Sequence, residues 1–127
     1  MAHVLVVDDS KVMRDMVTAC LKPKPELVIT QASSGLEAIE KLSLAPFDLM
    51  VLDLNMPDIG GIEVLEFVRA QDQLRSLPIL VVTSRGDDTS RERALGAGAT
   101  RYLTKPFDPS VIAAEMAALL AAGDGTA

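Results

Sequence analysis

Residues 3–10 read HVLVVDDS and decide the fold, because they join a short apolar run to two adjacent acids. The run from Val4 to Val7 is typical of a buried strand. It ends in Asp8 and Asp9, whose carboxylates repel each other and cost free energy near a core unless something neutralises them. We therefore expect a strand that ends at a site where the two acids have a partner.

The composition narrows the class of protein. The chain has 127 residues, 49% of them apolar but 3% aromatic, which predicts one domain with an aliphatic core. A formal net charge of −6 argues against a general nucleic-acid or acidic-membrane binder. No stretch is apolar and long enough to cross a bilayer, no leader pattern precedes the first strand, and Cys20 alone cannot form an internal disulfide. These features predict a soluble cytoplasmic domain.

Short apolar runs alternate with helix-period segments along the chain. The alternation predicts a parallel sheet with helices on both faces, an α/β fold. The strands after the first are expected at residues 27–30, 47–54, 79–84 and 100–105. The helices are expected to begin after Ser10, Ser34, Gly60, Asp88 and Asp108, with a capping box of Ser34 and Glu37 and a glycine cap near Gly98. We expect one domain over residues 1–122 and a disordered tail over residues 123–127.

The first helical segment carries an apolar stripe with a spacing near four, and we interpret it as facing the core. The stripe consists of Val12, Met13, Met16, Val17, Cys20 and Leu21. The methionines of the chain are interpreted as core residues, and Asp58 is assigned to a turn with Pro57 and Gly60.

Polar side chains follow the predicted strands where each strand ends. In open α/β sheets, ligands bind beyond the carboxyl ends of the strands, so these residues are the candidates for a site. They are Asp8 and Asp9 after the first strand, Asp53 and Asn55 after the third, Thr83 and Ser84 after the fourth, and Tyr102 and Lys105 at the fifth. The second strand ends in Gln31 and Ala32, which offer little chemistry.

Three carboxylates at one edge indicate a hard cation such as Mg²⁺, which takes oxygen ligands and keeps positions for waters and phosphate oxygens. Such a cation would offset the repulsion between Asp8 and Asp9. Together with the Lys105 ammonium and the Thr83 hydroxyl, it matches what a transferring phosphoryl group needs. Asp53 is then the natural nucleophile, since a carboxylate can accept phosphate as an acyl phosphate.

Four segments together resemble the receiver domains of two-component response regulators, including the CheY-like chemotaxis proteins. They are VVDDS, VLDLNMPDIGG, VVTS and YLTKPF, in a resemblance that runs from about residue 3 to residue 121. The resemblance implies a doubly wound, flavodoxin-like parallel sheet of five strands in the order 2-1-3-4-5, with five helices.

The resemblance also implies a mechanism. Asp53 would accept a phosphoryl group from a sensor histidine kinase or phosphotransfer protein. Asp9, Asp53 and the backbone carbonyl of Asn55 would bind Mg²⁺, and Asp8 would reach it through water. Lys105 would hold the phosphoryl oxygens or, before phosphorylation, the free carboxylate. The protein would act on its own aspartate and would not be an enzyme in the ordinary sense.

In the same resemblance, Thr83 and Tyr102 form the switch: Thr83 would bond the new phosphate and let Tyr102 move inward. The bond between Lys105 and Pro106 would be cis, and Asn55 and Arg85 would tune the rate of dephosphorylation. The fourth helix, fifth strand and fifth helix would bind a downstream protein. The positive residues of this region hint at an acidic partner: Arg85, Arg91, Arg93, Arg101 and Lys105. No direct nucleic-acid binding or membrane insertion is expected, and the domain would be a monomer or a phosphorylation-dependent dimer.

Other functions stay open at this point. The chain could be a stand-alone receiver or a receiver domain from a larger regulator. An aspartate-nucleophile phosphatase of the haloacid-dehalogenase type is also α/β, but Asn55 stands where such an enzyme needs a general acid. A flavodoxin-like cofactor binder would place Asp8 and Asp9 against its phosphate, with repulsion unless a metal intervened.

Overall fold

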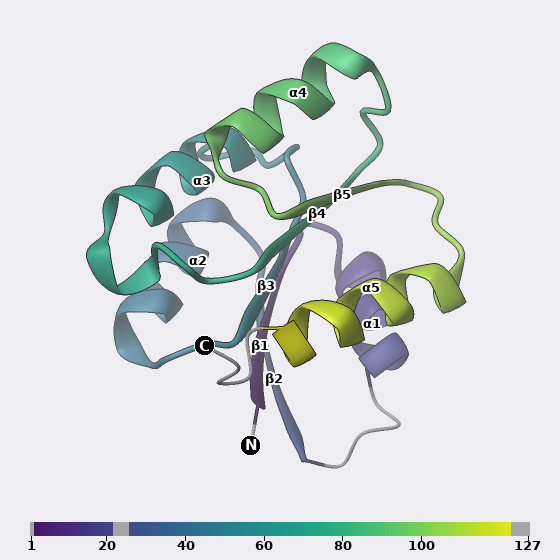
Figure 1. The fold of residues 1–127 in the computed structure, drawn as a ribbon, viewed down its shortest axis with the longest axis horizontal. Helices are drawn as coiled ribbons and strands as arrows, with labels where there is room; N and C mark the ends of the chain where they lie inside the picture. Colours follow the sequence, from purple (N-terminus) through teal and green to yellow (C-terminus); the bar gives the residue numbers. More distant parts are fainter. Residues whose placement is uncertain (1, 22–25, 123–127) are drawn as a thin grey trace.

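Strands and helices alternate through the computed structural model, which describes residues 2–21 and 26–122 (Figure 1). The elements are β1 (Ala2–Val7), α1 (Lys11–Leu21), β2 (Leu27–Ala32), α2 (Gly35–Leu44), β3 (Leu49–Leu52), α3 (Gly61–Ala70), the 3₁₀ turn η1 (Asp72–Leu74), β4 (Ile79–Thr83), α4 (Asp88–Ala97), β5 (Arg101–Thr104) and α5 (Pro109–Ala122). The predicted tail at residues 123–127 lies outside the described residues. Within them, no helix combines the length and apolar character that a membrane span requires.

The five strands form one parallel sheet in the order β2-β1-β3-β4-β5, which confirms the predicted doubly wound topology. The register places Val7 beside Ala32 on one side and Leu52 on the other. At the other half of the sheet, Thr83 is paired with Thr104. The carboxyl ends of the central strands therefore finish nearly level, and the residues that follow them share one edge.

Helices cover both faces of the sheet, with α1 and α5 on one face and α2, α3 and α4 on the other (Figure 1). Successive residues of β3 alternate between the two cores: Met50 packs with the α2–α4 side and Val51 with the α1–α5 side. Because both faces are buried, the strands are continuously apolar, as expected for a parallel sheet. The buried hydrophobic residues are all Val, Leu, Ile, Met or Ala, so the prediction of an aliphatic core is confirmed.

The predicted stripe on α1 is only partly right. Val17 and Leu21 are buried, but Val12 is 68% exposed and Met16 is 45% exposed. Val12 and Met16 each lie one position before Met13 and Val17, and one position on a helix is a rotation of about 100°. They therefore lie on the outer side of α1, and the interpretation of every methionine as a core residue is wrong for Met16.

Local capping explains where several helices begin and end. The Ser34 hydroxyl accepts a hydrogen bond from the Glu37 backbone N–H at 3.1 Å, as predicted. The Glu37 carboxylate, however, accepts from the backbone N–H of Ser33 at 2.6 Å, so the second half of the capping box is displaced by one residue. Asp108 accepts from the Ser110 backbone N–H, the first N–H of α5 because Pro109 has none, and Gly98 caps the end of α4 with φ of 121°, which suits glycine.

Candidate functional site

Buried polar residues lie together at the carboxyl edge of the sheet. Among the residues whose burial is described, Asp8, Asp53 and Thr83 are the only buried polar or charged ones, with exposures of 6%, 5% and 0%. Backbone bonds extend the sheet beyond its strands: Asp53 N–H donates to Val7 C=O at 3.0 Å, and Lys105 N–H donates to Thr83 C=O at 2.8 Å. The sheet itself therefore brings the acids and the lysine to one place.

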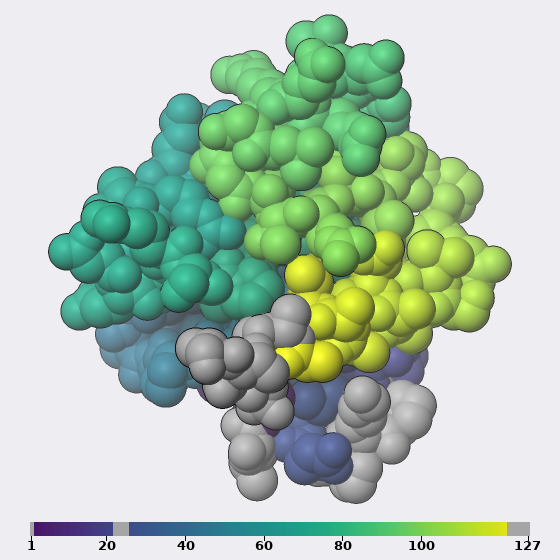
Figure 2. Space-filling model, viewed as in Figure 1, coloured from purple at the N-terminus to yellow at the C-terminus, as the bar shows by residue number. Residues whose placement is uncertain are grey.

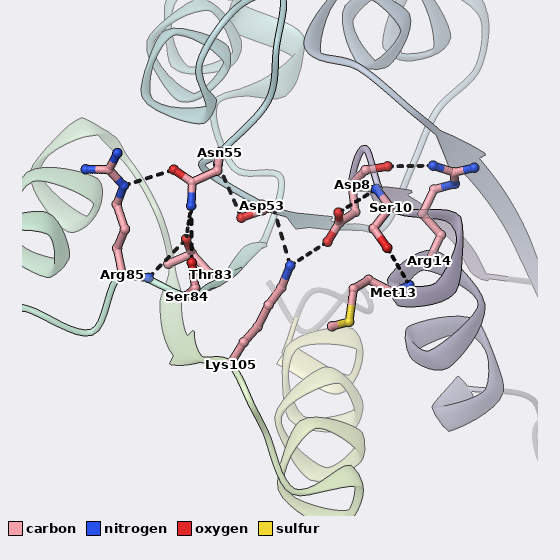
Figure 3. A network of polar contacts seen from close by, with 10 residues as sticks. All are labelled: Asp8, Ser10, Met13, Arg14, Asp53, Asn55, Thr83, Ser84, Arg85 and Lys105. Atoms are coloured by element: carbon pink, nitrogen blue, oxygen red, sulfur yellow. Dashed lines mark hydrogen bonds and ion pairs between the residues drawn. The ribbon is translucent and has the colours of Figure 1, made fainter.

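Lys105 points from the loop after β5 into the acids (Figure 3). Its Nζ lies 2.8 Å from Asp8 Oδ2 and 3.4 Å from Asp53 Oδ2. Burial by itself lowers the pKa of Lys105, but the contacts with Asp8 and Asp53 outweigh burial and raise the pKa above its ordinary value. The ammonium therefore stays charged. The Lys105–Pro106 peptide bond is cis, as the resemblance implies.

Asp53 is held in an environment that disfavours its charge. Burial, chiefly, raises the pKa of its carboxyl, and the neighbouring charge of Asp8 adds to the effect. The Lys105 ammonium and the Asn55 backbone N–H, which lies 3.3 Å from Asp53 Oδ1, oppose the rise without cancelling it. An ionised Asp53 thus gains from any further positive charge placed beside it.

The three acids fit a divalent cation. One carboxylate oxygen from each of Asp8, Asp9 and Asp53 lies within 4.8 Å of the others. Oxygen ligands of Mg²⁺ lie about 3 Å apart when adjacent and about 4 Å apart when opposite, given its bond lengths. Three carboxylates face the single ammonium of Lys105, so a doubly charged cation would balance the cluster. Asp9 is exposed, which leaves the cluster open to solvent on one side.

Replacing Asp53 by asparagine is expected to raise the free energy of unfolding near pH 7, without divalent cations, by about 1 kcal/mol. The folded-state pKa of Asp53 lies above 3.8, so the wild type loses stability as pH rises from that value through the folded pKa. Asparagine does not ionise, so the variant does not lose stability in this way. Urea denaturation of both proteins checks the result: the advantage of the variant should shrink as pH falls towards about 4. A variant that is less stable than the wild type near pH 7 would contradict it.

Asn55 and Arg85 lie in contact at the side of the site. Asn55 Oδ1 accepts a hydrogen bond from Arg85 Nε at 2.9 Å, and Asn55 Nδ2 lies 3.4 Å from the hydroxyls of Thr83 and Ser84. The two positions that the resemblance links to dephosphorylation are therefore a bonded pair beside Asp53. This contact is visible on one side of Figure 3.

Tyr102 and Thr83 are connected through a single residue. The Tyr102 hydroxyl donates to the backbone carbonyl of Arg85, and the Arg85 backbone N–H lies 3.4 Å from Thr83 Oγ1. Tyr102 is half-buried, and burial chiefly raises the pKa of its hydroxyl. The two residues predicted to form the switch thus contact opposite ends of Arg85.

The loop between β3 and α3 is fixed by contacts that the sequence pattern did not reveal. Asp58, assigned to a local turn, accepts from the backbone N–H groups of Gly35 at 3.1 Å and Leu36 at 2.9 Å, at the start of α2. A Cβ on Gly61 would lie 2.7 Å from the backbone oxygen of Asp53, so only glycine lets α3 begin this close to the site. The preference of acids for helix N-termini was a usable signal for Asp58, but it did not identify which helix.

Two further residues near the acids were missed. Arg14 Nη1 donates to the backbone carbonyl of Asp8 at 2.7 Å. Gln31, judged to offer little chemistry, bonds through its side chain to Arg14 at 3.1 Å, Asp15 at 3.2 Å and Thr18 at 3.0 Å. These contacts arise because α1 packs beside β2, and they make Gln31 a structural partner of α1.

Comparisons with known proteins agree with this geometry. The family model described as the response regulator receiver domain matches residues 4–117. The chemotaxis protein CheY1 of Helicobacter pylori strain J99 is 34% identical over 121 residues, which cover 94% of this chain and 98% of the relative. The chemotaxis protein CheY homolog of Campylobacter jejuni is 34% identical over 122 residues, covering 95% and 94%.

Solved structures give the same result at the level of the fold. The chemotaxis response regulator CheY4 of Vibrio cholerae is 35% identical, with a TM-score of 0.86 over 94% of this chain and 98% of that one. This similarity in fold agrees with three features of the chain itself: the sheet order, the acid cluster and the lysine at the carboxyl edge. The chain therefore belongs to the response regulator receiver domains, the CheY-like signalling domains of two-component systems.

Proposed function

We propose that this protein is a phosphorylation-operated switch in which Asp53 accepts a phosphoryl group from a sensor histidine kinase or phosphotransfer protein. The observation that supports it most is the burial of Asp53 among Asp8, Asp9 and Lys105. A buried carboxylate beside other acids lowers the stability of the fold. A role as phosphoacceptor explains why such a residue is found there. Receiver domains are signalling proteins, and in this proposal the chain catalyses only the phosphorylation and dephosphorylation of its own Asp53.

In the proposed reaction, a carboxylate oxygen of Asp53 attacks phosphorus and the bond from phosphorus to the histidine nitrogen breaks. The electron pair of that bond returns to the imidazole, and an acyl phosphate forms on Asp53. Asp9, Asp53 and the backbone carbonyl of Asn55 would hold Mg²⁺, with Asp8 behind a water. When bound, this ion neutralises charge on the phosphoryl oxygens.

Lys105 has the position to complete this charge balance. Its Nζ is 3.4 Å from Asp53 Oδ2, so a small movement would let it donate to a phosphoryl oxygen on Asp53. It contacts Asp8 more closely, at 2.8 Å, which keeps the ammonium at the site before phosphorylation. We infer that Lys105 exchanges part of its contact with the acids for contact with the phosphoryl group.

Thr83 is suited to report the arrival of that group. Its hydroxyl has contacts at 3.4 Å with Asn55 Nδ2 and with Arg85 N–H, near the upper limit for a hydrogen bond. A charged phosphoryl oxygen is a stronger partner for a hydroxyl donor. A turn of Thr83 towards Asp53 would release the Arg85 backbone, whose carbonyl accepts from Tyr102. We propose that this sequence of contacts carries the signal to β5.

Replacing Thr83 by alanine is expected to remove most of the response of Tyr102 to a phosphoryl mimic while leaving binding of the mimic intact. The physical reason is that alanine keeps Asp53 and Lys105 but has no hydroxyl to follow the phosphoryl group. Tyr102 is the only tyrosine and the chain has no tryptophan, so intrinsic fluorescence reports on it directly. Beryllofluoride with Mg²⁺ is the probe, and Thr83→Ser is the matched control that retains the response. An undiminished response in Thr83→Ala would contradict the role of Thr83.

The output surface is proposed to be α4, β5 and α5, which adjoin on one side of the molecule, green to yellow in Figure 2. The positive charge predicted for this region is weaker than expected. Lys105 points into the acid cluster, and Arg101 pairs with Glu115 at 3.1 Å. The exposed arginines that are left are balanced by as many acids: Arg85, Arg91 and Arg93 against Asp87, Asp88 and Glu92. Charge therefore gives little support to an acidic partner.

We propose a downstream protein as the target, with the domain acting as a monomer or a phosphorylation-dependent dimer. The acidic net charge supports neither direct nucleic-acid binding nor membrane insertion, and a cytoplasmic location is part of the proposal. Residues 1–122 are proposed as a single receiver domain. A stand-alone receiver is the form that we propose, by analogy with the chemotaxis protein CheY1, 98% of whose length the match covers.

The phosphatase alternative is weaker. Its general acid would stand at position 55, where an asparagine amide bonds to Arg85 and lies beside Thr83. An amide cannot protonate a leaving group at neutral pH. Position 55 thus offers no general acid to the proposed nucleophile Asp53, which fits a domain that keeps its phosphoryl group for a time.

A further inference from the structure

Arg14 contacts the peptide that joins the two acids after β1. Its Nη1 donates to the Asp8 backbone carbonyl at 2.7 Å, a link drawn in Figure 3. Fixing that carbonyl fixes the plane of the Asp8–Asp9 peptide and with it the Asp9 Cα, which restricts the directions that the Asp9 side chain can take. From this geometry we infer that Arg14, supported by Gln31, is a positioning residue for cation binding. The inference rests on the Mg²⁺ site proposed above.

Asp9 needs this help more than Asp8 does. The Asp8 carboxylate is already held, because it accepts from Ser10 N–H at 2.9 Å and pairs with Lys105. Asp9 is exposed, and no ion pair within residues 2–21 and 26–122 holds its carboxylate. Its orientation therefore depends on the backbone, and the backbone is held by Arg14.

Gln31 holds the Arg14 side chain in place beside the Asp8 carbonyl. The Gln31 Oε1 accepts from Arg14 Nε at 3.1 Å, while its Nε2 donates to Thr18 at 3.0 Å and Asp15 at 3.2 Å. Both ends of the amide are occupied, so its rotamer is fixed. Gln31 itself lies within β2, paired in register with Val6 of β1. The support for the acid pair thus runs from the sheet through Gln31 and Arg14 to the Asp8 carbonyl.

Charge and positioning make opposite predictions for Arg14. A guanidinium beside the acids repels a divalent cation, so charge alone predicts that its removal tightens binding. None of the ion pairs among residues 2–21 and 26–122 involves Arg14, so within these residues its charge is offset only by the more distant carboxylates of Asp15 and Glu37. Positioning predicts the reverse, since residues that orient metal ligands strengthen binding by about tenfold or more. The sign of the change therefore separates the two effects.

The first test is calorimetric titration of Mg²⁺ into the wild type, Arg14→Gln and Lys11→Gln. Lys11 is the matched control: it is also a cation in the first turn of α1, but its ammonium pairs with Asp15 at 2.7 Å on the surface. Arg14→Gln is expected to bind Mg²⁺ about tenfold more weakly. Lys11→Gln should stay within about twofold of the wild type. Equal or tighter binding by Arg14→Gln overturns the inference, and a wild type that binds no Mg²⁺ overturns the proposed metal site with it.

The second test separates positioning from general damage to the fold. Gln31→Leu leaves the guanidinium charge in place and removes its support, so it should weaken Mg²⁺ binding in the same direction, by about threefold. The double variant with Arg14→Gln and Gln31→Leu should bind Mg²⁺ no more weakly than Arg14→Gln alone. Arg14 and Gln31 support the Asp8 carbonyl together, so losing both costs no more than losing Arg14. At saturating Mg²⁺, phosphorylation of Arg14→Gln by acetyl phosphate should return to within about twofold of the wild-type rate. Additive losses, or a rate that stays low at saturating Mg²⁺, overturn the positioning role.

Discussion

Replacing Asp53 by asparagine is expected to abolish phosphorylation of this protein by acetyl phosphate. The amide is nearly the same size, but it is uncharged and a poor nucleophile, so no acyl phosphate can form at this position. The fold should persist, since the substitution removes a buried charge whose pKa is already raised by burial. Phosphate-affinity electrophoresis after a fixed exposure to the phosphodonor measures the loss.

The control for this experiment is another acid on the surface. Asp72→Asn makes the same chemical change in η1, where the carboxylate pairs with Arg75 in an exposed salt bridge at 2.6 Å. Such pairs contribute little, so Asp72→Asn should be phosphorylated at the wild-type rate. Phosphorylation that persists in Asp53→Asn would show that another residue is the acceptor.

Replacing Lys105 by alanine is expected to slow phosphorylation by about a hundredfold and to remove the conformational response, while Mg²⁺ binding is kept. The ammonium is the only charged donor that contacts both Asp8 and Asp53 among the described residues. Its loss removes positive charge that competes with the cation, so Mg²⁺ affinity should not fall. Stopped-flow measurement of phosphorylation, calorimetry with Mg²⁺, and Tyr102 fluorescence give the three readouts.

Lys105→Arg is the informative companion, because it keeps the charge and alters the geometry. Arginine carries a planar fork in place of a compact ammonium, so we expect a rate between those of the wild type and the alanine variant. If the alanine variant bound the phosphoryl mimic and showed the full Tyr102 response, the role given to Lys105 would be wrong.

The sequence predicted the parts of the site that depend on strand order. Asp8, Asp53, Thr83 and Lys105 each follow an apolar run, and parallel strands bring their carboxyl ends to one edge. Strand order alone, without knowledge of how side chains pack, predicts that these four residues lie close together, and they do so in the structure. The aliphatic core was predictable for the same reason, since the near absence of aromatics leaves only aliphatic side chains to fill it.

The parts that were missed depend on how elements pack. Asp58 holds the start of α2, more than twenty positions away, and Gln31 bonds three residues of α1. Neither contact has a sequence period. The rotation of α1 that exposes Val12 and Met16 is likewise set by its packing on the sheet and α5. The positive charge of residues 85–105 was overestimated for a similar reason, because Lys105 points into the acid cluster and not to the surface.

The most direct test of phosphorylation at Asp53 is an intact-protein mass spectrum of the wild type after exposure to acetyl phosphate, with Mg²⁺ and with a chelator. We expect one added phosphoryl group that requires Mg²⁺ and that borohydride reduction and peptide mapping locate at Asp53. A phosphoryl group on any other residue, one that forms equally well with the chelator, or none in the presence of Mg²⁺ would contradict it.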